Sequence, residues 1–136
     1  MTKEDIAQVI KQIPELNEFG IGLFNGGRGL SEREKTHALK EGQEALLDSA
    51  DQCTAICEWL RQMEKIKTIS RRCTSYGLKH VFERDTGRYV TNGAFICAAI
   101  HSGFDYKLIP GSPNVPFNIS ERSLNTVEKR LEGKRQ

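Results

Sequence analysis

The stretch CTSYGLKHVFERDTGRYVTNGAFICAAIHSGF, residues 73–104, decides the fold of this chain. Its first half predicts a helix over 75–84, because Thr74 is a good N-cap residue and apolar residues recur at intervals of three and four. Those apolar residues are Leu78, Val81 and Phe82. Gly87 marks the predicted turn after this helix, since glycine readily adopts the positive φ that follows many helices.

The second half of the stretch predicts a helix over 91–102 that is apolar on every side. Thr91 or Asn92 caps its start, and Gly103 is placed to end it. The residues from 94 to 100, AFICAAI, leave almost no polar face, and a helix that is apolar all round is a buried helix. We therefore expect this helix to form the centre of the core.

The length of 136 residues predicts a single domain built around one core. Hydrophobic residues make up 38% and charged residues 28%, as in a globular protein in water. No apolar run approaches the ~18 residues that a membrane-spanning helix needs. The N-terminal sequence MTKEDIAQVIKQIPEL also lacks an apolar signal core. We therefore expect no membrane partner and a cytoplasmic location.

Four consecutive segments make up the predicted domain over 1–136. They are a short helix with a Gly-rich loop (1–30), a long helix (31–66), a helix-turn-helix-like core with a β-hairpin (67–120), and a C-terminal helix with a basic tail (121–136). The predicted fold class is therefore α+β and helix-dominated. The loop NEFGIGLFNGGRGL, residues 17–30, lacks the Lys-Ser/Thr pair of a nucleotide-binding loop, so we expect a flexible connection there.

The long helix is predicted to begin after Ser31, where SERE forms a capping box, and to bend at Gly42. Apolar residues follow it at a spacing of three and four: Leu39, Leu46, Cys53, Ile56, Leu60 and Met63. Such a stripe packs into the core of its own chain, or it forms the seam of a homodimer through the 38–66 helix. The sequence leaves both alternatives open.

Beyond the buried helix the apolar pattern changes to a period of two, which predicts a β-hairpin over 105–119. Its turn is the sequence PGSPN at 110–114, and Pro116 confines the second strand to an edge. A short strand or extended link, KTIS, is expected over 67–70. Ser120 caps the last helix.

Neither the four cysteines nor the three histidines form a recognisable metal or catalytic pattern. Cys53 and Cys57 share a helical face, but no C-x-x-C motif and no paired histidines accompany them. Cys73 follows Arg71 and Arg72, and nearby cations are the usual way to lower the pKa of a thiol. A structural thiol is nevertheless the more frequent case. We expect reduced cysteines, no metal, no cofactor and no enzymatic activity.

The charge of the chain is divided unevenly between its halves. Residues 1–60 contain 6 Lys and Arg against 11 Asp and Glu, a net charge of −5, whereas residues 61–136 contain 14 against 7, a net charge of +7. A basic half favours one surface that meets an anionic partner. An ordinary dipolar surface without a partner explains the same asymmetry.

The order of elements from the long helix onward resembles that of a winged helix-turn-helix domain. In that family a helix in the position of 91–102 enters the DNA major groove, and a hairpin in the position of 105–119 contacts the backbone. The resemblance therefore implies binding of double-stranded DNA. Basic and polar side chains that flank these elements are the predicted nucleic-acid-binding residues: Arg71, Arg72, Lys79, Arg84, Arg88, Asn92 and Lys107. Asn92 stands at a helix start, where its amide can pair with an adenine edge.

A second resemblance concerns the origin of the protein. The strings SYGLKH, YVTNGAFICAAIHSGF and PNVPFNIS, within residues 56–120, resemble small uncharacterised proteins carried by bacterial prophages and mobile elements. This resemblance implies a bacterial or phage protein, and the implied DNA binding makes a small regulator one role for it. It also opens an alternative: a non-enzymatic inhibitor that binds one host defence or replication protein through protein–protein contacts.

Overall fold

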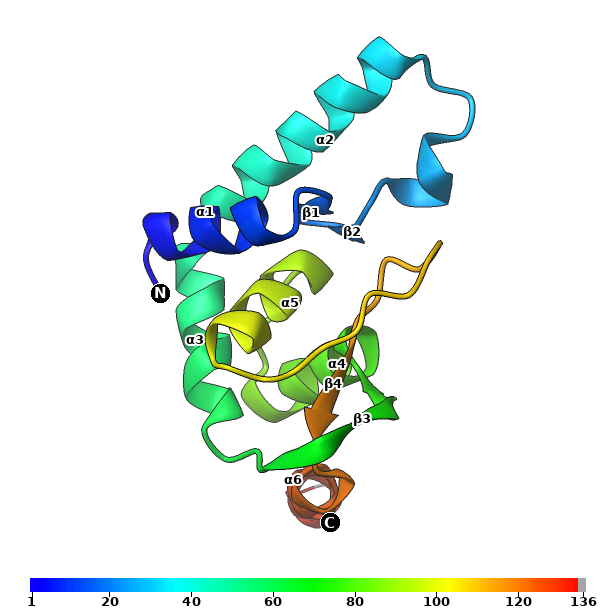
Figure 1. The fold of residues 1–136 in the computed structure, drawn as a ribbon. Helices are drawn as coiled ribbons and strands as arrows, with labels where there is room; N and C mark the ends of the chain where they lie inside the picture. The colour runs from blue at the N-terminus through cyan, green and yellow to red at the C-terminus, as the bar shows by residue number, and fades with distance from the viewer. Residues whose placement is uncertain (135–136) are drawn as a thin grey trace.

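The computed structural model describes residues 1–134 and confirms the predicted fold class, α+β and helix-dominated. The helices are α1 (Lys3–Gln12), α2 (Glu32–Leu47), α3 (Ala50–Leu60), α4 (Ser75–Thr86), α5 (Asn92–His101) and α6 (Glu121–Lys134), with a 3₁₀ helix η1 (Phe24–Gly27) (Figure 1). The strands are β1 (Leu16–Asn17), β2 (Gly20–Ile21), β3 (Lys65–Thr74) and β4 (Pro116–Ile119). They form two antiparallel pairs, β1 with β2 and β3 with β4. No helix of this described part is long and apolar enough to cross a membrane.

Helix α5 lies at the centre of the core, as the sequence predicts. Residues 93–99 of this helix are all buried, and α1, α3, α4 and β2 contact it (Figure 1). The side-chain oxygen of Thr91 accepts a hydrogen bond of 3.1 Å from the backbone N–H of Ala94 and thereby caps the helix. Because the side chains of 93–99 are apolar, packing rather than hydrogen bonding holds α5 in place.

The indole of Trp59 joins α3 to α4 and α5. Its ring meets the rings of Phe82 and Phe95 edge-on, at centroid distances of 5.6 and 6.2 Å. Its N–H donates a hydrogen bond of 2.8 Å to Asp85 Oδ2, which satisfies the polar end of a buried side chain. Arg130 of α6 donates to the same carboxylate oxygen at 2.8 Å. Asp85 therefore links the aromatic core to the C-terminal helix.

The predicted long helix is divided in two, α2 and α3, by a break at Asp48 and Ser49. The hydroxyl of Ser49 donates a hydrogen bond of 2.6 Å to the carbonyl oxygen of Leu46, and its backbone departs from helical geometry (φ −100°, ψ 26°). Serine and aspartate interrupt helices by competing for backbone groups in this way. The bend predicted at Gly42 is wrong: this glycine instead admits Asn17, whose Oδ1 would lie 2.8 Å from a Cβ there.

The apolar stripe of α2 and α3 is internal to the chain. The exposed fractions are between 0 and 6% for most of its residues: Leu46, Cys53, Ile56, Leu60 and Met63. Leu39, near the middle of α2, is half-buried. Of the two alternatives for this stripe, the structure shows the first, because these side chains pack in the core of their own chain. A homodimer through the 38–66 helix stays a prediction.

Strand β4 pairs chiefly with β3 rather than with the other arm of the hairpin predicted over 105–119. Phe117 of β4 lies opposite Ser70 of β3, and an isolated bridge places Tyr106 opposite the same phenylalanine. All four residues of β4 are buried, and the ten residues of β3 extend well beyond the strand predicted over 67–70. The backbone partners of β4 therefore lie in a segment that is distant in the sequence, which a local hairpin pattern cannot show.

The first part of the Gly-rich segment is an anchored hairpin. Strands β1 and β2 pair, and the hairpin is fastened by backbone hydrogen bonds from Glu18 N–H to Gly42 O (3.0 Å), from Ile21 N–H to Pro113 O (3.0 Å) and from Gly93 N–H to Glu18 O (2.9 Å). The flexible connection predicted over 17–30 is therefore wrong for residues 17–21. The hydrogen-bond partners of these residues, Gly42, Gly93 and Pro113, are distant in the sequence, so a local sequence pattern does not reveal the contacts.

Helix α6 confirms the predicted C-terminal helix. It contacts α4 and β3 through a buried Val127 and the half-buried Leu124 and Leu131. The end of the predicted basic tail, residues 135–136, lies outside the described residues. The C-terminal helix thus adds its apolar side chains to the core next to α4 and β3.

Replacing Ile96 with alanine is expected to lower the free energy of unfolding by about 2–5 kcal/mol, because this fully buried side chain of α5 leaves a cavity behind. Ile100→Ala is expected to lower the free energy of unfolding by less, because Ile100 lies at the less buried end of the helix. Chemical denaturation of the purified variants measures both effects. Leu108→Ala, at an exposed position, is the control. An unchanged midpoint in Ile96→Ala would show that α5 is not the core.

Candidate nucleic-acid interface

Strand β3 positions the predicted arginine pair. Arg71 and Arg72 are both exposed, near the end of the strand that leads into α4. The guanidinium of Arg72 lies 4.0 Å from Glu121 Oε2, but its side chain is 85% exposed. Ion pairs with this exposure contribute only about 0–1 kcal/mol. Both arginine charges are therefore accessible to an anion in solution.

The other exposed basic residues predicted for the site lie on separate segments. Arg84 belongs to the last turn of α4, Arg88 follows that helix, and Lys107 lies between α5 and β4. On α4, Arg84 continues an exposed row with Tyr76 and His80, because residues four apart share a helix face. Exposed arginines thus occur near both ends of α4. Arg71 and Arg72 precede the helix, Arg84 lies in its last turn and Arg88 follows it.

Lys79 is not the exposed basic residue that the sequence predicts. Its side chain is only 10% exposed, and Nζ donates a hydrogen bond of 3.0 Å to Glu83 Oε2. The same oxygen accepts from the backbone N–H of Val90 at 3.1 Å, and Nζ lies 4.8 Å from the ring centre of Tyr89. A buried charge requires such a partner. Lys79 therefore fastens α4 to the segment that follows it, and its charge is already paired.

Asn92, predicted to reach a base edge, is tied into the fold instead. Its Nδ2 lies within hydrogen-bonding distance of three oxygens: Phe19 O (3.2 Å), Pro113 O (3.3 Å) and Asn114 Oδ1 (3.0 Å). Its Oδ1 is buried and has no hydrogen-bond partner within the described residues. The reverse orientation would set an oxygen against three acceptors, so this orientation of the amide is the favourable one. Asn92 joins the β1–β2 hairpin to the 113–114 segment.

These contacts surround a groove of about 460 Å³ beside α4, which we call the tyrosine groove. Its lining residues are Glu18, Phe19, Tyr76, Lys79, Tyr89, Thr91, Asn92, Pro113 and Asn114. Tyr76 and Tyr89 are 53% and 71% exposed. The sequence did not identify either tyrosine as a site residue, because the segments that line this groove are far apart in the chain and only the fold brings them together.

Helix α5 is too deeply buried for the recognition helix that the winged helix-turn-helix resemblance implies. Residues 93–99 are buried, and the β1–β2 hairpin covers the start of the helix. A helix that reads bases must present its side chains to the major groove. Helix α5 therefore cannot present its side chains as a recognition helix does.

Three of the four cysteine thiols have a raised pKa, whereas a hydrogen bond with Cys97 lowers the pKa of Cys53, which is fully buried. Burial raises the pKa of Cys73 although Arg71 and Arg72 are its neighbours in sequence, so the lowered pKa considered for this thiol is wrong. Burial also raises the pKa of Cys57, and a hydrogen bond with Cys53 raises that of Cys97 together with burial. Within residues 1–134, no three side chains of His, Cys, Asp or Glu are arranged to hold a metal ion.

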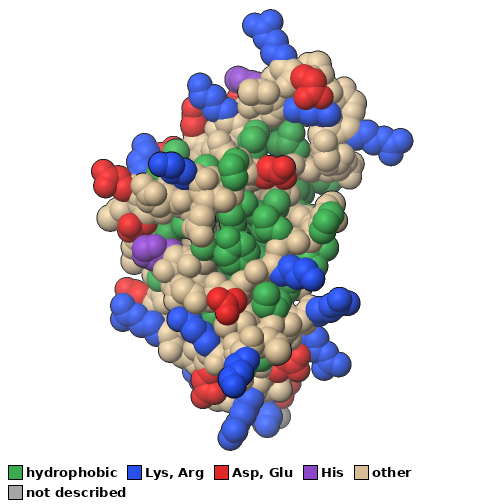
Figure 2. Space-filling view, in the orientation of Figure 1, with side chains coloured by type: hydrophobic (Ala, Val, Ile, Leu, Met, Phe, Trp, Pro, Cys, Tyr) green, Lys and Arg blue, Asp and Glu red, His purple; other side chains and the backbone are tan. Residues whose placement is uncertain are grey.

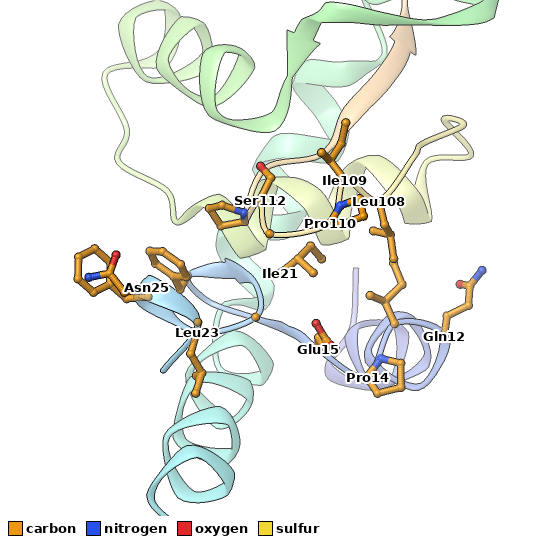
Figure 3. A pocket seen from close by; sticks show the side chains of 17 residues that line it. Gln12, Pro14, Glu15, Ile21, Leu23, Asn25, Leu108, Ile109, Pro110 and Ser112 are labelled. Atoms are coloured by element: carbon orange, nitrogen blue, oxygen red, sulfur yellow. The ribbon is translucent and has the colours of Figure 1, made fainter. Parts of the chain in front are cut away.

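A second groove, of about 680 Å³, runs between the end of α1, the β1–β2 hairpin with η1, and the 108–113 segment (Figure 3). We call it the apolar groove. Its exposed apolar side chains include Phe24 (70%), Leu108 (43%) and Ile109 (41%). Figure 2 shows apolar side chains gathered in the middle of this face, with most Lys and Arg side chains around them. An exposed apolar cluster of this kind marks an interaction site.

No family model matches this chain, and neither the curated proteins nor the solved structures contain a significant match. The function is therefore inferred from the two surfaces themselves. One is the basic region of β3 and α4 with the tyrosine groove, and the other is the apolar groove.

Gly93→Ala is expected to displace the β1–β2 hairpin and to destabilise the protein by at least about 1–3 kcal/mol, the usual cost of overpacking. A Cβ at this position would overlap the carbonyl oxygen of Asn17. Gly77→Ala is the matched control within α4, because its Cβ would meet only Thr74 Oγ1, at 3.7 Å. Helix propensity predicts a gain of up to ~1 kcal/mol there. Thermal unfolding of both variants tests the expectation, and equal midpoints would contradict it.

Proposed function

We propose that this protein binds double-stranded DNA through phosphate contacts made by basic side chains of β3. The supporting observation is that β3 contains no acidic residue and exposes Lys67, Arg71 and Arg72. A fourth cation, Lys65, donates from Nζ to the carbonyl oxygen of Ser102 at 3.1 Å and is already engaged. Contacts of Lys and Arg with phosphate supply most of the sequence-independent affinity of proteins for DNA.

The distribution of charge favours the same partner. Residues 61–136 carry 14 Lys and Arg against 7 Asp and Glu. A net positive field over one half of a protein attracts a polyanion before contact is made. In the cell, such a protein acts as a regulator carried by a bacterial prophage or mobile element, in the cytoplasm and without enzymatic activity. The prophage or mobile-element origin in this proposal rests on the resemblance in sequence, and the regulatory role rests on the proposed DNA binding.

Binding of double-stranded DNA is expected to weaken steeply as salt rises, because each phosphate that is neutralised releases counterions. Arg71→Ala combined with Arg72→Ala is expected to weaken binding of every sequence about equally. The same double variant should flatten the log–log dependence of affinity on salt by up to ~2 units, about one for each phosphate that is no longer neutralised. Filter binding of the wild type and the variant over a salt series measures both quantities.

The matched control replaces Arg33 and Lys40 with alanine. Both are exposed basic residues of α2, which lies at the opposite end of the molecule from β3 (Figure 1). This control removes the same charge and is expected to retain most of the affinity. If both double variants bind alike, the β3 surface is not the site. If the wild type binds no DNA even at low salt, the proposal fails.

The apolar groove supports a second candidate function, inhibition of one host defence or replication protein by direct binding. Phe24 is 70% exposed although it is a large apolar side chain, and it lies in this groove with Leu108 and Ile109. Aromatic and aliphatic side chains of this kind are the usual anchors of protein–protein interfaces. A protein partner that buries them explains their exposure in the free chain.

Phe24→Asp combined with Leu108→Asp is expected to abolish binding of such a partner, because two carboxylates would be desolvated at the interface. Pull-down from bacterial lysate, with and without nuclease treatment, with the wild type and the variant, provides the measurement. Ile66→Asp, which changes an exposed apolar residue of β3, is the control. A host protein retained equally by all three forms would argue against this groove, and recovery of nucleic acid alone would favour DNA binding.

A further inference from the structure

We infer that the tyrosine groove binds an unpaired nucleobase, so that the protein prefers DNA in which a single strand adjoins a duplex. The inference rests on the proposed DNA binding and adds to it the form of DNA that is recognised. Three features of the groove carry it: two exposed aromatic rings, a polar wall with free donor and acceptor groups, and the arginines of β3 nearby.

The two tyrosines offer open rings that are held in place from behind. Lys79 Nζ lies over the ring of Tyr89, 4.8 Å from its centre, yet 71% of this tyrosine is exposed. The ring of Tyr76 contacts His80 edge-on at a centroid distance of 4.4 Å and is 53% exposed. Exposed aromatic rings beside basic residues are the platforms on which proteins stack the bases of single strands.

The wall of the groove carries groups that match the edge of a base. The side chain of Glu18 is exposed and contributes hydrogen-bond acceptors. Asn114 uses its Oδ1 to accept from Asn92, which leaves its Nδ2 as a donor without a partner among the described residues. Bases present both amino groups and acceptor atoms on their edges. The volume of about 460 Å³ lies within the range of pockets for small organic groups, roughly 300–1,000 Å³.

Two exposed arginines lie close to the tyrosines of the groove along the chain. Arg72 precedes Tyr76 by four residues, so their Cα atoms are at most about 14 Å apart. Arg88 is exposed and directly precedes Tyr89. A strand whose base stacks in the groove therefore has two exposed arginines close to the stacking tyrosines for its phosphates. Lys79 is not expected to bind a phosphate, because Glu83 already neutralises its charge. Its contribution to the groove is its contact with the ring of Tyr89.

The test compares a blunt duplex with the same duplex carrying a short single-stranded overhang, each fluorescently labelled, by anisotropy. Wild-type protein is expected to bind the overhang duplex roughly tenfold to a hundredfold more tightly, as the stacking of a base on an aromatic ring predicts. Tyr89→Ala is expected to remove most of this preference, and Tyr89→Phe is expected to retain it. Neither change should alter the salt dependence measured on the blunt duplex, because neither removes a phosphate contact.

Phe24→Ala is the matched control, because it removes another exposed aromatic side chain from the apolar groove and should leave the preference intact. A ribonucleotide overhang distinguishes RNA from DNA as the source of the unpaired base, and a preference for either supports the groove. Equal affinity for blunt and overhang duplexes overturns this inference and leaves the proposed function standing. A preference that survives Tyr76→Ala and Tyr89→Ala together also overturns it. No binding of either probe overturns both.

Discussion

The carbonyl oxygen of Asn17 occupies the space that a side chain on Gly93 would need. Through this contact the β1–β2 hairpin closes over the first turn of α5, and the N–H of Gly93 donates to Glu18 O at 2.9 Å. The first turn of a helix has N–H groups without intrahelical partners, and this turn is surrounded by apolar residues. The hairpin therefore accepts a hydrogen bond from the buried N–H of Gly93 and covers the first turn of α5.

Burial of α5 also decides which elements remain for function. Helix α4 buries Leu78, Val81 and Phe82 and keeps Tyr76, His80 and Arg84 on its outer face. Helix α5 has no such outer face, because residues 93–99 are all covered. Helix α5, which is the most apolar segment of the sequence, is thus part of the core and has a structural role. The surfaces that we propose for a partner are built from α4 and β3 and from the segments that bound the two grooves.

Acidic groups on α4 reduce the basic charge that is available to a ligand. Glu83 pairs with Lys79 at 3.0 Å, and Asp85 accepts from both Trp59 and Arg130 at 2.8 Å. These carboxylates organise the core and in doing so neutralise cations that the sequence counts as basic. Strand β3 carries no acidic residue and exposes Lys67, Arg71 and Arg72. A count of charges along the chain therefore identifies the basic half but not the basic surface.

The sequence alone determined the helices α4 and α5 and their ends, because the cap of a helix lies next to it in the chain. Thr74 and Thr91 cap these helices, and Gly87 follows α4 with a φ of 71°. It also determined the burial of α5, since no arrangement exposes AFICAAI to water without a penalty. The pairing of β4 with β3 was decided by the tertiary structure. So was the tyrosine groove, in which Tyr89 and the amide of Asn114 meet only after α5 has been covered. Their alignment depends on hydrogen bonds and packing between distant segments, which no periodicity within a single segment can encode.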